Sequence, residues 1–124
     1  MFVLVSLLVG ACSVGTHDEL LDGLQRDAQS VTPEGTREVR LDRYWCGEAG
    51  DDSSPVAVVR VLNVEGRTKL VTARDKIIGG FVRRGWTRNT NAPRASATTE
   101  DRVLWVRGTR RTITVEVIAP TVLC

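Results

Sequence analysis

The apolar run at residues 56–62, with the sequence VAVVRVL, most constrains the fold of this chain. Successive side chains of a strand point to opposite faces, so a strand that is apolar on both faces is typical of one covered on both sides. Arg60 is the only charged residue of the run. We therefore expect residues 56–62 to form a strand in the middle of a sheet.

Two other stretches carry apolar residues at helical spacing. Thr16 and Glu19 form a capping box that predicts a helix over residues 17–30. The apolar residues at helical spacing are Leu20, Leu21, Leu24, Ala28 and, just after the helix, Val31. Residues 68–84 predict the main amphipathic helix, with a stripe of Leu70, Val71, Ala73, Ile77, Ile78, Phe81 and Val82. Inside that helix Gly79 and Gly80 each cost about 1 kcal/mol relative to alanine. The alternative is a hairpin that turns at Glu65-Gly66, followed by a short helix capped by Thr72.

Arg74 lies near the middle of the apolar stripe of residues 68–84. An arginine in such a place either extends its head group to solvent or is paired. We predict an ion pair between Arg74 and an acid from the first half of the chain, either Glu38 or Asp42.

The remaining stretches predict strands at residues 38–45, 86–90, 102–107 and 112–118, and the glycine at 85 ends the main helix. In the first of them Val39, Leu41 and Trp45 are expected on one face. The turn at Gly108-Thr109-Arg110 predicts a hairpin between the last two strands. This order predicts an α+β two-layer sandwich, an antiparallel sheet of about five strands with two helices on one face.

The N-terminal segment resembles a bacterial lipoprotein signal. An apolar run ends in Val9-Gly10-Ala11-Cys12, which matches the lipobox pattern of an aliphatic residue, a small residue, Gly or Ala, and then Cys. The resemblance implies a signal peptide at residues 1–11, lipidation of Cys12, a tether at residues 12–16 and a single domain at residues 17–124. It also implies a position at the extracytoplasmic face of the cell membrane. An uncleaved membrane anchor and a buried element of a cytosolic protein are the alternatives.

With Cys12 lipidated, Cys46 and Cys124 are the two remaining cysteines, and outside the cytoplasm they are expected to pair. In the chain-entropy model so long a closure is worth about 4 kcal/mol. The mature part of the chain is similar to small two-layer domains of uncharacterised actinobacterial lipoproteins, a likeness of pattern that implies no activity.

Charge is distributed unevenly along the chain. Residues 17–66 hold eleven acids and five arginines, a net charge of −6, whereas residues 67–111 hold twelve cations and three acids, a net charge of +9. We expect the two halves to attract one another. Six arginines are candidates for contact with an anionic surface such as lipid headgroups: Arg83, Arg84, Arg88, Arg107, Arg110 and Arg111.

No catalytic constellation is evident in the sequence. The only histidine, His17, is expected at an exposed helix start, and the acids around Asp51-Asp52 lack the alternating spacing of an EF-hand loop. We therefore expect no enzyme, no metal, no cofactor and no nucleic-acid partner. The sequence favours a lipid-anchored binding domain whose partners are the membrane and either anionic lipid or a protein. An immunity or exclusion protein that inhibits a protein partner is the alternative, and a hydrolase is the less favoured one.

Overall fold

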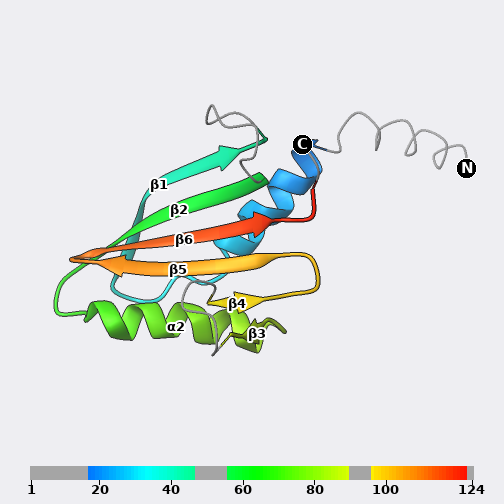
Figure 1. Cartoon of the computed structure of the whole chain (residues 1–124). Coiled ribbons are helices and arrows are strands. Elements are labelled where there is room, and N and C mark those ends of the chain that lie inside the picture. The colour runs from blue at the N-terminus through cyan, green and yellow to red at the C-terminus, as the bar shows by residue number, and fades with distance from the viewer. Residues whose placement is uncertain (1–16, 47–55, 90–95, 123–124) are drawn as a thin grey trace, which may run out of the picture.

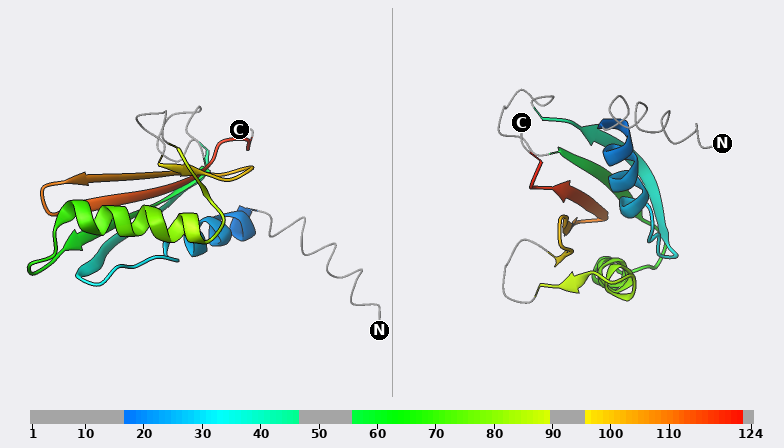
Figure 2. Two further views of the ribbon diagram at one scale, coloured as in Figure 1. Left: turned by 90° about the horizontal axis from the view of Figure 1, so that it is seen from below. Right: turned by 90° about the vertical axis from the view of Figure 1, so that its right-hand side faces the viewer.

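The computed structural model describes residues 17–46, 56–89 and 96–122. These residues form a six-stranded antiparallel sheet with two helices on one face, and the right-hand view of Figure 2 shows both helices on the same side of the curved sheet. The predicted α+β two-layer sandwich is confirmed, with six strands instead of about five. The predicted signal peptide and tether, Thr16 and Cys124 lie outside the described residues.

The elements follow one another in the predicted order, except that an additional strand, β4, lies between β3 and β5. The chain runs through a helix at residues 17–28, here called the N-terminal helix, and then β1 (Thr36–Tyr44), β2 (Val56–Val64), α2 (Leu70–Arg83), β3 (Thr87–Arg88), β4 (Ala97–Thr98), β5 (Val103–Thr109) and β6 (Thr112–Ala119). Across the sheet the order is β1-β2-β6-β5-β4-β3 (Figure 1). The strand formed by the run at residues 56–62 therefore lies inside the sheet, between β1 and β6.

One core lies between the sheet and the helices. Alternate residues of β2, β5 and β6 point toward the helices and are fully or almost fully buried: Val56, Val58, Leu62, Val64, Leu104, Val106, Ile113, Val115 and Val117. The N-terminal helix contributes Leu21, Leu24 and Ala28, and α2 contributes Ala73, Ile77, Ile78 and Phe81. The predicted stripe of the N-terminal helix is thus confirmed. On α2, by contrast, Val71 and Val82 are exposed and lie outside the core.

The main-helix prediction is confirmed and the hairpin alternative is wrong. The chain turns at Gly66, where φ is +62°, and α2 then runs unbroken from Leu70 to Arg83 with Thr72 inside it. Gly80 is buried where α2 meets the segment after the N-terminal helix, and a Cβ atom built there would lie 2.7 Å from both γ-methyl groups of Val31. Gly85, whose φ is +102°, follows the C-cap residue Arg84 and turns the chain away from the helix.

Two details of the strands differ from the prediction. A β-bulge between Glu38 and Arg40 leaves Val39 without a partner and exposed, so Val39 does not share the core face with Leu41. The second detail is β4, which was not predicted, and its partner β3, which is shorter than expected. Strands of two residues carry no periodicity that a sequence could show.

Candidate interaction surface

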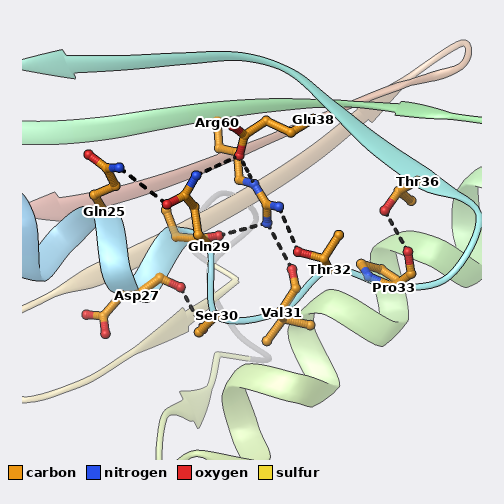
Figure 3. Close-up of polar contacts among 11 residues, drawn as sticks. Gln25, Asp27, Gln29, Ser30, Val31, Thr32, Pro33, Thr36, Glu38 and Arg60 are labelled. Carbon is orange, nitrogen blue, oxygen red and sulfur yellow. Dashed lines mark hydrogen bonds and ion pairs between the residues drawn. The ribbon is translucent and has the colours of Figure 1, made fainter.

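The polar contacts of Arg60 hold the end of the N-terminal helix against the sheet (Figure 3). The Arg60 side chain is buried, and its Nε donates to Oε1 of Glu38 at 2.6 Å. Nη1 donates to the carbonyl oxygens of Ala28 and Val31, both at 3.1 Å, and Nη2 donates to Oγ1 of Thr32 at 2.7 Å. The last carbonyls of a helix lack partners within it, so Arg60 satisfies groups that would otherwise be buried unpaired. Because most of its donors are used, Arg60 has a structural role.

Glu38 is the acid that pairs with Arg60. Burial raises the pKa of Glu38, but hydrogen bonds from Gln29 and Arg60 and the positive charge of Arg60 outweigh burial, so that its pKa lies below the usual value.

The predicted pairing of Arg74 with Glu38 or Asp42 is wrong. The Nε atom of Arg74 donates to the carbonyl oxygen of Val106 at 3.1 Å, and Nη1 lies 3.8 Å from the carboxylate of Asp75. The Arg74 side chain is 40% exposed. Arg74 therefore extends its head group toward solvent along the edge of the core.

The face of the sheet opposite the helices carries the residues that alternate with the core. Val59 and Val61 of β2, Val103 and Trp105 of β5 and Tyr44 of β1 are only half-buried there. The register places them close together, because Val59 and Trp105 both pair with Glu116 of the intervening β6. We call this surface the helix-free face.

Charged side chains lie among and beside the apolar residues of the helix-free face, since Glu116 of β6 stands between Val59 and Trp105. Arg107 lies over the ring of Trp105, with its guanidinium carbon 4.9 Å from the ring centroid, and it also pairs with Glu116 at 3.1 Å. Arg40 pairs with Asp42 on the side of β1. Half-buried aromatic and apolar side chains beside an arginine are typical of protein interfaces.

Two shallow polar grooves are present in the described part of the chain. One, of about 270 Å³, lies on the helix-free face and is lined by Arg107, Thr109, Thr112 and Thr114. The other, of about 280 Å³, lies between the N-terminal helix and β1 and is lined by Asp22, Gln25, Arg26, Gln29 and Arg43. In the second groove Arg43 bonds to Asp22 and Gln25, so its polar groups partly satisfy one another.

The six candidate arginines lie at two opposite ends of the sheet. Thr87, next to Arg88, belongs to a row of paired residues that crosses the sheet to Tyr44 through Thr98, Val103, Ile118 and Ala57. Arg83, Arg84 and Arg88 are exposed at this end. Arg110 and Arg111 form the turn between β5 and β6 at the other end, with Arg107 nearby on the helix-free face.

The N-terminal helix begins at the end that holds Arg88. His17 stacks on Trp45, which directly follows β1, with ring centroids 3.8 Å apart. His17 is exposed, as expected, but the stacking partner was not predicted. Four acids also lie at this end of the sheet: Asp18, Glu19, Glu100 and Asp101.

At the other end four cations form a patch that we call the basic tip: Arg67, Lys69, Arg110 and Arg111. The Arg111 side chain joins its two parts, since Nη2 donates to the carbonyl oxygen of Gly66 at 2.9 Å and Nη1 to that of Thr68 at 2.8 Å. All four side chains belong to exposed residues.

The distribution of ion pairs shows why the positive charge of the basic tip is not neutralised by acids of the described chain. Of the pairs that the structure shows among described residues, only Arg102 with Asp27 joins the basic half of the chain to the acidic half. The acids of the first half pair mainly with arginines of the same half, as in Arg37 with Glu65 and Arg60 with Glu38. The expected attraction between the halves is thus made by a single pair, and no described acid forms an ion pair with the basic tip.

The remaining candidates are placed as follows. Cys46 is partly buried against the core, at the same end of the sheet as Val122, whereas Cys12 and Cys124 lie outside the described residues. Within the described ranges no three potential metal ligands gather, and the acids at 51–52 lie outside them. No described helix is long and apolar enough to cross a membrane.

Comparison with known proteins finds no matching family model, no matching curated protein and no matching solved structure. The arrangement of residues therefore carries the functional argument alone.

Proposed function

We propose that this chain is a lipid-anchored binding domain at the extracytoplasmic face of the cell membrane, and that it binds a protein partner through the helix-free face. The observation that carries the binding proposal is the set of half-buried apolar side chains on that face, Val59, Val61 and Trp105, with Arg107 over the Trp105 ring. Tryptophan and arginine are the residues that most often dominate binding energy at protein interfaces. An immunity or exclusion protein is one form of this proposal, since it too acts by covering a protein partner.

The anchor proposal rests on the lipobox at Val9-Gly10-Ala11-Cys12. The pairing of Cys46 with Cys124 belongs to the same proposal, because disulfides persist outside the cytoplasm. It is supported by the register, which places the ends of β1 and β6 at one end of the sheet through Tyr44, Ala57 and Ile118. Both Cys46 and Val122 pack there against the core.

The anchor is tested by the intact mass of the protein from membranes of its native host, with and without reductant before alkylation. We expect a mass that begins at Cys12 and includes a diacylglyceryl group, with two cysteines alkylated only after reduction. An unprocessed mass with free thiols would refute both the anchor and the disulfide.

The binding surface is tested by placing a photo-crosslinking amino acid at one position at a time in the full chain. We expect one discrete crosslinked protein from position 61 or 105 on the helix-free face. Position 71 is the matched control, because Val71 is a valine of the helix layer that is 67% exposed. Equal crosslinking from position 71, or none from the helix-free face in native membranes, would refute the proposed binding surface.

A further inference from the structure

We infer that the basic tip, formed by Arg67, Lys69, Arg110 and Arg111, is a docking site for an acidic segment of the protein partner. This inference rests on the proposed function, and it specifies the chemistry of the partner. The tip lies at the distal end of the helix-free face, since Arg110 and Arg111 connect β5 to β6, the strands that carry Trp105 and Thr114. A partner that covers the face would therefore also reach the tip.

The first support is uncompensated charge. The four cations are exposed, and no described acid pairs with them. Glu65, which is two residues before Arg67 in the sequence, is already paired with Arg37 at 2.8 Å. Guanidinium groups bind carboxylates through paired hydrogen bonds, so an acidic segment complements this surface.

The second support is the backbone of Arg110. Its φ is +58°, and it is the only non-glycine residue with positive φ in the described part of the chain. A side chain in this conformation is disfavoured, and glycine is the usual residue at such a turn position. An arginine held there at a cost to stability is the kind of outlier that points to a function for the side chain.

The third support is the position of the tip relative to the proposed anchor. His17 lies at the opposite end of the sheet, and the eight residues of β6 span roughly 25 Å between the two ends. Interactions between exposed charges are screened beyond about 8 Å at physiological ionic strength. In a domain anchored through Cys12, the tip thus lies at the end of the sheet far from the first described residue, which favours a protein over lipid headgroups.

The test uses two matched triple variants of the full chain, each of which removes three cations. The distal variant is Arg67→Gln, Lys69→Gln and Arg110→Gly, and the proximal variant is Arg83→Gln, Arg84→Gln and Arg88→Gln. Arg111 is left intact because it bonds to the loop between β2 and α2. The probe is a fluorescent peptide of glutamates, whose binding is followed by anisotropy at low and at physiological salt.

We expect the distal variant to bind the peptide about tenfold more weakly than the wild type, as for three exposed ion pairs. The proximal variant should bind it as the wild type does. Equal losses in both variants, or no binding by the wild type, would overturn the inference. Loss of binding to phosphatidylglycerol vesicles in the distal variant alone would also overturn it, because the tip would then be a lipid site.

A single Arg110→Gly variant separates a binding role from a structural one. Relief of the positive-φ arginine should raise the urea midpoint while the affinity for the peptide falls. A lower urea midpoint would contradict the argument from backbone strain. The photo-crosslinking of positions 61 and 105 is independent of these measurements, so the inference can fail while the proposed binding surface stands.

Discussion

The close contact of Gly80 with Val31 gives a sharp prediction about stability. Replacing either Gly79 or Gly80 by alanine gains about 1 kcal/mol of helix propensity. At Gly80 the new methyl would lie 2.7 Å from both γ-methyl groups of Val31, a β-branched residue that cannot easily turn away. Such overpacking costs about 1–3 kcal/mol. Gly80→Ala should therefore lower the free energy of unfolding by up to about 2 kcal/mol.

Gly79→Ala is the matched control, since the nearest atom to its new methyl is Nη1 of Arg83 at 3.6 Å, an ordinary contact. It should stabilise the protein by about 1 kcal/mol. Adding Val31→Ala removes the two clashing methyl groups, so Gly80→Ala should become stabilising in that background. These differences are measured by urea unfolding of the wild type, Gly79→Ala, Gly80→Ala, Val31→Ala and the double variant of Val31→Ala with Gly80→Ala, at equal m values. If Gly79→Ala and Gly80→Ala stabilised the protein equally, the packing of α2 against Val31 described above would be wrong.

Three further predictions concern stability. Arg60→Ala should lower the free energy of unfolding by about 2–4 kcal/mol, because it leaves the carbonyl oxygens of Ala28 and Val31 without their donor and removes the charge that pairs with Glu38, and a cost near zero would refute the structural role of Arg60. The lowered pKa of Glu38 means that its contribution is complete above the usual carboxyl pKa and is lost as pH falls through the lowered value. Between pH 7 and pH 3, the free energy of unfolding of Glu38→Gln should therefore decrease less steeply with falling pH than that of the wild type. An identical slope in the two proteins would contradict the pairing of Glu38 with Arg60. Reduction of the proposed bond between Cys46 and Cys124 should lower the free energy of unfolding by about 4 kcal/mol in the chain-entropy model; unchanged unfolding under reductant would remove the disulfide from the proposal.

The periodicity of the sequence was sufficient to predict the elements, because each long helix or strand has an apolar stripe of its own. The spacing of Leu21, Leu24 and Ala28 and the run at residues 56–62 show this. The periodicity of the sequence does not predict the contacts between elements. A helical wheel places Arg74 in the apolar stripe but gives no measure of how far its side chain extends toward solvent.

Arg60 is the opposite case, a buried arginine whose partners the sequence does not indicate. Its burial depends on the free carbonyls of Ala28 and Val31, which the fold brings to it from a segment about thirty residues away. The candidate surface was predictable in part, because Arg110 and Arg111 stand out by charge, whereas Arg67 and Lys69 join them only through the fold. The helix-free face was not predictable from the sequence. Trp105 of β5 and Val61 of β2 come close only because both strands pair with β6.

The strand order also determines when the chain can fold. Among the described strands β6 comes last in sequence, yet it lies between β2 and β5 and joins the two halves of the sheet (Figure 1). Until β6 is synthesised, β2 lacks one of its neighbours. The pair formed by β1 and β2 is then not connected to β3, β4 and β5. Contacts between distant parts of a chain form slowly because long loops must close first. A chain that we propose is exported thus reaches its compact state late, which favours passage across the membrane in an unfolded form.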